Sequence, residues 1–339
     1  MTMPANARKQ NIVHLEAGQR IDEEIYRIAQ KDLRTTTNGS LYIHSVLADA
    51  TGEMLARIWN ASQELYDSMP EGGFMRFRGR VENYKGHRQF IIDGMRIVAE
   101  HEVDPTEFLP ATKKNVEQMW SRTKEILRSI ENPHLIALVA EFVNDERFVR
   151  SFKNAPAAVT NHHAYLGGLL EHTLNLLELV VLIAPRYPEV SRDLLLVSIF
   201  LHDSGKTAEL GYSTNFTYTN EGQLIGHITL AVIWVAEKIR IIEDRTNEPF
   251  PVDLANAVKH IILAHHGRYE YGSPRLPAMA EAFFVHYIDN LDAKMNQVFA
   301  AIESDPDKES DWTGFVRALD TKIYKPDVMG IRPTLDDLD

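Results

Sequence analysis

The chain has 339 residues, no cysteine and a net charge of −12. The lack of cysteine excludes disulfides, Cys-ligated zinc and a thiol nucleophile, and it favours a cytoplasmic location. The negative charge argues against a general binder of polyanions, although a local basic patch remains compatible with it. Residues 1–10 lack the apolar core of a signal peptide, and charges interrupt the apolar runs, so no membrane segment is predicted. The length allows two domains.

Residues 11–101 show the pattern of short β-strands. Alternation of apolar and polar residues predicts strands at 41–49 and 54–59, joined by a turn at 51–52. A second pair of strands is predicted at 74–84 and 88–98, with a turn at 85–86. Several strands with turn signals in so short a segment predict a small barrel or sandwich.

One face of this β segment is basic. Residues 76–96 contain six basic and two acidic residues. Arg76, Arg78 and Arg80 share a face by the two-residue period of a strand, and Tyr84 and Arg88 follow near the next turn. Guanidinium groups with aromatic rings in reach are what an OB-fold uses to bind single-stranded nucleic acid. A solvated strand face with the aromatic rings in the core is the alternative.

From residue 112 onward the chain is predicted to be helical almost to its end. Residues 112–130 have the spacing of an amphipathic helix that links two domains. Further helices are predicted at residues 133–143, 162–183, 192–203, 224–241, 254–265 and 279–301.

Histidines and carboxylates stand at the ends of several of these apolar helices. The apolar run 194–201 ends in His202 and Asp203, and a buried carboxylate needs a cation or a hydrogen-bonded partner. His172, His227, the pair 265–266 and Asp289 occupy similar positions. Each residue alone is more often an ordinary core or surface residue, but together they indicate convergence on metal. So many ligands indicate two ions that share a carboxylate, and the lack of thiolates argues against structural zinc.

The ordered set of histidines and aspartates resembles the extended signature of HD-domain phosphohydrolases, over about residues 155–295. Within it, segments 162–173, 222–227, 265–274 and 287–292 are similar to the YhaM-type 3′–5′ exoribonucleases. That family joins an N-terminal OB-fold to a C-terminal HD domain. The same order of domains is predicted here from the residue patterns.

The resemblance implies a role for each residue. The ligands of one divalent cation would be His172, His202, Asp203 and Asp289, and those of a second would be His227, His265 and His266, with Asp203 bridging. Asp203 and Lys206 would be catalytic, with Lys206 contacting a phosphate oxygen; a surface lysine is the alternative. His162 and His163 would orient a ligand or contact phosphate, although a surface pair at a helix start fits equally well. Mn²⁺ is the first choice of cation, with Co²⁺, Fe²⁺ or Zn²⁺ as alternatives.

The sequence therefore predicts a multidomain protein, with an all-β OB-fold-like barrel followed by an all-α HD domain. The expected boundaries are 1–104 for the barrel, 105–154 for a helical linker, 155–322 for the HD domain and 323–339 for a polar acidic tail. The expected function is metal-dependent 3′–5′ exoribonuclease activity on single-stranded RNA that releases nucleoside monophosphates. The alternatives are hydrolysis of nucleotides or cyclic dinucleotides, and non-catalytic binding of nucleic acid. Single-stranded DNA is a further candidate ligand, and a homo-oligomer is left open.

Overall fold

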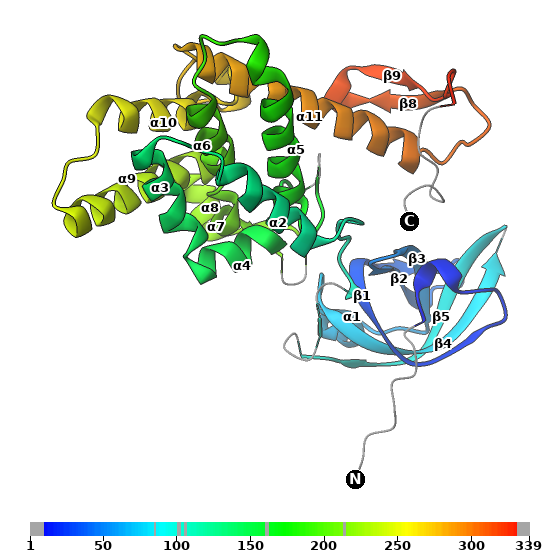
Figure 1. The fold of residues 1–339 in the computed structure, drawn as a ribbon. Helices are drawn as coiled ribbons and strands as arrows, with labels where there is room; N and C mark the ends of the chain where they lie inside the picture. Colours follow the sequence, from blue (N-terminus) through cyan, green and yellow to red (C-terminus); the bar gives the residue numbers. More distant parts are fainter. Residues whose placement is uncertain are drawn as a thin grey trace.

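The computed structural model describes residues 10–84, 86–99, 103–104, 107–159, 163–212 and 215–330. It contains a β-barrel followed by a body of helices, which Figure 1 shows side by side. This arrangement confirms the predicted fold class.

The barrel is closed by five strands in the order β1-β2-β3-β5-β4, which is the strand order of an OB-fold. Its elements are β1 (Arg20–Thr35), β2 (Leu41–Asp49), β3 (Gly52–Trp59), the short helix α1 (Gln63–Ser68), β4 (Phe74–Tyr84) and β5 (His87–Ile97). Neighbouring strands are antiparallel except β3 and β5, which pair in parallel. Tyr26, Phe77 and Phe90 are buried in its centre.

Strand β1 is the one strand of the barrel that the alternation pattern did not locate. Its register shifts between Ile21 and Glu24 and again between Ile28 and Gln30. Each shift moves the following side chains to the other face, so the apolar and polar residues do not alternate along the whole strand.

The helical body is organised around one continuous apolar core. Its helices are α2 (Val116–Leu127), α3 (Pro133–Val143), α4 (Glu146–Asn154), α5 (Gly168–Ile183), α6 (Arg192–His202), α7 (Lys206–Glu209), α8 (Asn220–Ile225), α9 (His227–Thr246), α10 (Val252–Ala264) and α11 (Ala280–Ser304). Helix α6 is buried from Leu194 to its last residue. The segment predicted as a linker belongs to the same core, because Trp120 of α2, Phe142 of α3 and Phe152 of α4 are buried in it.

Of two predicted helices, one begins later than expected and one is interrupted, because residues near these points adopt positive φ angles. Helix α5 begins at Gly168 rather than at residue 162, since His163 (φ 51°) and Gly167 (φ 78°) both adopt left-handed conformations. The helix predicted at 224–241 is interrupted at Gly226 (φ 76°), which separates α8 from α9. His227 thereby becomes the first residue of α9.

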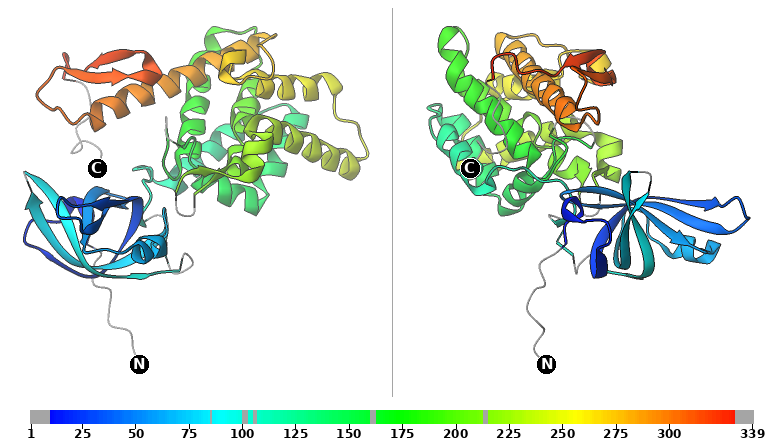
Figure 2. Two further views of the ribbon diagram at one scale, coloured as in Figure 1. Left: turned by 180° about the vertical axis from the view of Figure 1, so that it is seen from behind. Right: turned by 90° about the vertical axis from the view of Figure 1, so that its right-hand side faces the viewer.

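A β-hairpin follows α11, where the sequence predicted no strand. Strands β8 (Trp312–Val316) and β9 (Thr321–Tyr324) are joined by the turn η6 (Arg317–Leu319). Figure 2 shows the hairpin at the C-terminal end of α11. The rings of Trp312 and Tyr324 lie 5.1 Å apart across the two strands, and such cross-strand aromatic pairs stabilise short hairpins.

One helical segment, Gly168–Arg186, is long and apolar enough to cross a membrane by length and composition alone. More than half of it, 56%, is buried inside the structure, and it carries the buried His172. It is therefore a core helix of the domain.

Helix α4 is anchored at its start by Asp145. The carboxylate accepts a hydrogen bond from the Phe148 N–H (3.1 Å) and pairs with Lys238 of α9 (2.9 Å). The hydrogen bonds from Lys238 and from Phe148 lower the pKa of Asp145. Its stabilising contribution is therefore complete above the usual carboxyl pKa and is lost as the pH falls through the lowered value.

We expect Asp145→Ala to reduce the free energy of unfolding by about 1 kcal/mol at neutral pH, the usual cost of losing an N-cap. Urea unfolding followed by helical circular dichroism measures this difference, which shrinks in acid. Exposed Glu146, the next residue, supplies the control variant Glu146→Ala. An equal effect of both substitutions would contradict the assigned role of Asp145.

Candidate metal centre

The predicted ligands meet where five helices end, begin or pass. His172 lies in α5, His202 ends α6, and His227 begins α9. The pair 265–266 follows α10, and Asp289 lies in α11. The structure brings together all seven residues that the sequence predicted as ligands, in overlapping groups whose candidate ligand atoms lie within 4.8 Å of one another.

Asp203 lies at the middle of this arrangement and is 3% exposed. Its Oδ1 is 3.4 Å from Nε2 of His227 and 3.6 Å from Nε2 of His265. Its Oδ2 is 3.3 Å from Nε2 of His202 and 3.8 Å from Nε2 of His172. One carboxylate thus faces both predicted groups of ligands, as a bridging ligand must.

Each imidazole presents the same nitrogen to this centre. The Nδ1 atoms of the five histidines lie 2.7–2.9 Å from oxygen atoms of Ile199, Ile262, Tyr271, Glu209 and Asp292. Carbonyl and carboxylate oxygens only accept hydrogen bonds, so each Nδ1 carries the proton. In the neutral ring each Nε2 then offers a lone pair, which is the form that binds a metal ion.

Several of these inward-facing atoms lack a protein partner. Among the described residues, none forms a hydrogen bond with the buried Nε2 atoms of His202, His227 and His265 or with Oδ1 of Asp203. A buried polar atom left in this state costs about 1–3 kcal/mol. Divalent cations would satisfy all four atoms at once. The donor set of imidazoles and carboxylates therefore fits divalent cations.

The electrostatics of the centre favour a neutral His265 beside a charged Asp203. Burial and the nearby His266 and His202 hold the pKa of His265 well below its usual range. Burial alone would raise the pKa of Asp203, but Lys206, His202 and His227 together outweigh it and hold that pKa well below its usual value. His265 and Asp203 are therefore held in the ionisation states in which an imidazole and a carboxylate bind cations.

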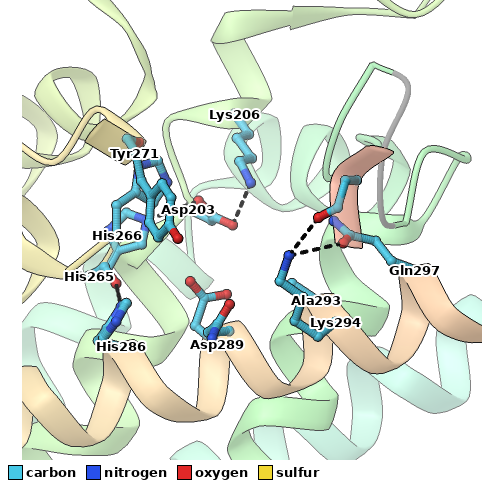
Figure 3. Close-up of a pocket in the computed structure, with 12 residues that line it drawn as sticks. Asp203, Lys206, His265, His266, Tyr271, His286, Asp289, Ala293, Lys294 and Gln297 are labelled. Atoms are coloured by element: carbon cyan, nitrogen blue, oxygen red, sulfur yellow. Dashed lines mark hydrogen bonds and ion pairs between the residues drawn. The ribbon is translucent and has the colours of Figure 1, made fainter. Parts of the chain in front are cut away.

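Lys206 is buried, and its ammonium group faces Asp203 rather than solvent. Its Nζ donates to Oδ2 of Asp203 at 2.7 Å, as Figure 3 shows. Burial lowers the pKa of Lys206, but the charge and hydrogen bond of Asp203, together with the charges of Asp289 and Glu209, outweigh burial and raise that pKa, so the lysine stays protonated. This position excludes the alternative of a surface lysine.

Asp292, one turn after Asp289, connects two of the predicted histidines. Its Oδ2 accepts hydrogen bonds from Nδ1 of His172 (2.7 Å) and from Nε2 of His163 (2.8 Å). Asn175 donates to its other oxygen at 3.0 Å. His163 thus bonds to the carboxylate that orients the predicted ligand His172, which agrees with its predicted role of orienting a ligand. His162 lies outside the described residues. Sequence analysis did not assign Asp292, although its spacing from Asp289 places both on one face of α11.

Burial lowers the pKa of His172, but hydrogen bonds with Asp289 and Asp292 outweigh that effect and raise the pKa to about 10. The two aspartates also have lowered pKa values, because their hydrogen bonds to histidine outweigh the opposite effect of burial. Asp292 therefore stays ionised and holds the ring of His172 in place.

We expect Asp292→Asn to weaken divalent-cation binding by about 10–100-fold, the usual effect of losing a residue that orients a metal ligand. Calorimetric titration of metal-free protein with Mn²⁺ measures the affinity. Asp253→Asn, at an exposed position near the start of α10, is the control. Unchanged affinity in Asp292→Asn would show that His172 needs no such support.

Glu209 orients His227 in the same way, and sequence analysis did not assign this residue either. Its Oε1 accepts hydrogen bonds from both the backbone N–H and Nδ1 of His227, each at 2.9 Å. Gly205 allows this arrangement, because a Cβ at that position would lie 2.1 Å from the carbonyl oxygen of His227. The glycine after the His-Asp pair is thus required for the close approach of α9.

The predicted arginines of the barrel share an outer face, but most of them already form hydrogen bonds or ion pairs with other groups of the chain. Arg76 donates to the Glu23 carbonyl (2.7 Å), and Arg80 pairs with Glu82 and Asp93. Arg88 donates to the backbone of the 13–15 segment, and Arg78 is exposed.

A second group on the barrel combines aromatic rings with an arginine. It comprises Tyr42, Arg57, Trp59 and Tyr84, hereafter the barrel aromatic cluster. The Arg57 guanidinium lies 5.5 Å from the ring centre of Trp59 and 5.3 Å from that of Tyr84. Trp59 and Tyr84 are 43% and 48% exposed, so their faces are accessible. Of these four residues, sequence analysis had predicted only Tyr84 to bind nucleic acid.

Comparison with known proteins gives different matches for the two parts of the chain. Residues 169–294 match the family model described as HD domain. This match suggests a metal-dependent phosphohydrolase. It covers the segments that carry all seven predicted ligands.

Solved structures similar to this chain include OB-fold proteins. A domain of replication protein A from Methanococcus maripaludis is 18% identical over 27% of this chain and 96% of that chain, with a TM-score of 0.23. A single-stranded DNA binding protein from Thermus aquaticus is 17% identical over 22% of this chain and 38% of that chain, with a TM-score of 0.21. The OB-like assignment itself rests on the strand order of the barrel. The chain thus joins an OB-like barrel to a helical region that contains an HD domain.

Proposed function

We propose that this protein is a metal-dependent 3′–5′ exoribonuclease that hydrolyses single-stranded RNA and releases nucleoside 5′-monophosphates. The observation that carries the proposal is the convergence of four imidazole Nε2 atoms, those of His172, His202, His227 and His265, on the carboxylate of Asp203. We propose two divalent cations there, Mn²⁺ first among them, with the two groups of ligands named above.

Such cations lower the pKa of water and neutralise charge on a phosphate, which is the chemistry that phosphodiester hydrolysis needs. In the proposed reaction a water oxygen attacks phosphorus while the bond from phosphorus to the 3′-oxygen of the preceding nucleotide breaks. That oxygen takes up a proton, and the phosphate stays on the released nucleotide.

Residues of this chain would hold the cations, contact the phosphate and orient the ligands. Asp203 would bridge the cations, and Lys206 contributes to keeping it ionised. The Lys206 ammonium lines the same pocket as Asp289 and has further N–H groups with which to contact a phosphate oxygen. Asp292 and Glu209 fix the orientation of the His172 and His227 rings through hydrogen bonds to their Nδ1 atoms.

The barrel would bind the single strand. Exposed rings of the barrel aromatic cluster offer faces on which bases stack, and Arg57 adds a cation beside them. The predicted residue Tyr84 belongs to this cluster, and Arg78 is exposed on the same strand, β4. The ion-paired Arg76 and Arg80, and Arg88, which donates to backbone carbonyls, would contribute positive charge. The substrate preference for RNA and the 3′ direction rest on the similarity of the motif segments to the YhaM-type enzymes.

A time course with 5′-labelled single-stranded RNA tests the proposal. Metal-free protein receives Mn²⁺, Co²⁺, Mg²⁺ or Zn²⁺ in turn. We expect a cation-dependent ladder that shortens from the 3′ end. Intact RNA with every cation would reject the proposal. Hydrolysis of nucleotides or cyclic dinucleotides in the same samples would then identify the alternative substrates, and RNA binding without cleavage would identify a non-catalytic binder.

A further inference from the structure

The pocket that opens on the candidate metal centre has two chemically different ends. Its volume is about 310 Å³, at the lower limit of ligand sites in proteins. One end is lined by predicted ligands, among them Asp203, His265 and Asp289. The other end is lined by Asn290, Ala293, Lys294, Gln297 and Ala318. Figure 3 shows Lys294 and Lys206 on different sides of the open space.

Lys294 is held at this second end by the C-terminal hairpin. Its Nζ donates to the carbonyl oxygen of Ala318 at 3.0 Å and to Oε1 of Gln297 at 3.5 Å. Ala318 belongs to η6, the turn between β8 and β9. The hairpin therefore forms part of the pocket wall and fixes the position of the ammonium group.

Among the described residues that line it, the second end offers hydrogen-bonding groups but no further carboxylate. Lys294 and Gln297 follow Asn290 on α11 by four and seven residues, so the three side chains share one face of the helix. An ammonium group has three N–H donors, and the two interactions above account for two of them. A donor thus remains for a ligand, with the amide groups of Asn290 and Gln297 beside it.

We propose that Lys294, Asn290 and Gln297 bind the ribose and base of the nucleotide that is cleaved from the chain end. This inference rests on the proposed function. When the scissile phosphate lies at the metal end, the sugar and base of the same nucleotide extend away from it. The hydroxyls of ribose and the carbonyl oxygens of a base accept hydrogen bonds from ammonium and amide groups. The size of the pocket suits one such nucleotide rather than several.

Binding of adenosine 5′-monophosphate by calorimetry, in the presence of Mn²⁺, tests the inference without requiring catalysis. We expect Lys294→Met, which keeps the aliphatic stem, to weaken binding about tenfold or more, as expected for a lost hydrogen bond to a charged group. Gln297→Ala should weaken it in the same direction. Lys322→Met, at an exposed position of β9 that does not line the pocket, is the control and should bind like wild type.

Two phosphodiester substrates distinguish nucleotide binding from damage to the centre. Bis(p-nitrophenyl) phosphate has no nucleoside, whereas the p-nitrophenyl ester of adenosine 5′-monophosphate has one. We expect Lys294→Met to raise the KM of the nucleoside ester about tenfold and to leave hydrolysis of bis(p-nitrophenyl) phosphate close to wild type. An equal loss on both substrates, or unchanged affinity for adenosine 5′-monophosphate, would overturn the inference. Failure of the wild type on both substrates with every cation would instead reject the proposed function.

Discussion

Replacement of Asp203 by asparagine is expected to abolish phosphodiester hydrolysis, with a loss of at least about 10³-fold, equivalent to about 4 kcal/mol of transition-state stabilisation. Asparagine removes the only carboxylate that lies within 4 Å of four different imidazole Nε2 atoms in the described part of the chain. It also leaves the buried ammonium of Lys206 without its partner at 2.7 Å. Hydrolysis of bis(p-nitrophenyl) phosphate with added Mn²⁺ measures the loss.

The matched control for this substitution is Asp244→Asn, at an exposed position on α9. It changes the net charge equally and should retain full activity. Circular dichroism establishes that both variants are folded. If the folded Asp203→Asn protein retains a tenth or more of the wild-type rate, Asp203 is not the bridging ligand.

Replacement of Gly205 by alanine is expected to be almost as damaging, although a single methyl group is added. The new Cβ would lie 2.1 Å from the carbonyl oxygen and 2.8 Å from the Cα atom of His227. These are backbone atoms at the start of α9, so the helix start must shift to make room. A shift of about 1 Å at a reacting centre costs about 10²-fold in rate. We therefore expect a loss of that order in hydrolysis, together with weaker Mn²⁺ binding.

Gly314→Ala provides the comparison, because a Cβ at Gly314 meets no atom within 4 Å. It should leave both rate and metal affinity unchanged. A fully active Gly205→Ala protein would mean that the spacing between α7 and α9 does not set the geometry of the centre.

The ligands could be predicted from the sequence because they interrupt apolar helices. His202 and Asp203 follow eight buried residues of α6, and Asp289 stands between the buried Val285 and the half-buried Ala293 on α11. Polar residues at such positions need a partner whatever the fold, so their convergence could be inferred without knowing the topology. The domain order followed from a change in hydrophobic period, from two residues to three or four.

The residues that orient the ligands could not be predicted in the same way. Asp292 lies 120 positions from His172 in the sequence, so no local pattern links them. Glu209 belongs to a four-residue helix that is too short for a periodic signal. Lys294 resembles any exposed lysine until the hairpin brings Ala318 to it. Strand β1 could not be predicted, because two register shifts disrupt the alternation of its apolar and polar residues.

The number of divalent cations bound per chain tests the central claim most directly. Metal-free wild-type protein is titrated with Mn²⁺ while the free ion is followed by electron paramagnetic resonance, and Asp203→Asn is titrated in parallel. We predict two tightly bound ions in the wild type and loss of tight binding in Asp203→Asn, because the bridge between the two groups of ligands is removed. A wild-type protein that binds no ion tightly, or a variant that binds as the wild type does, would contradict a metal centre built around Asp203.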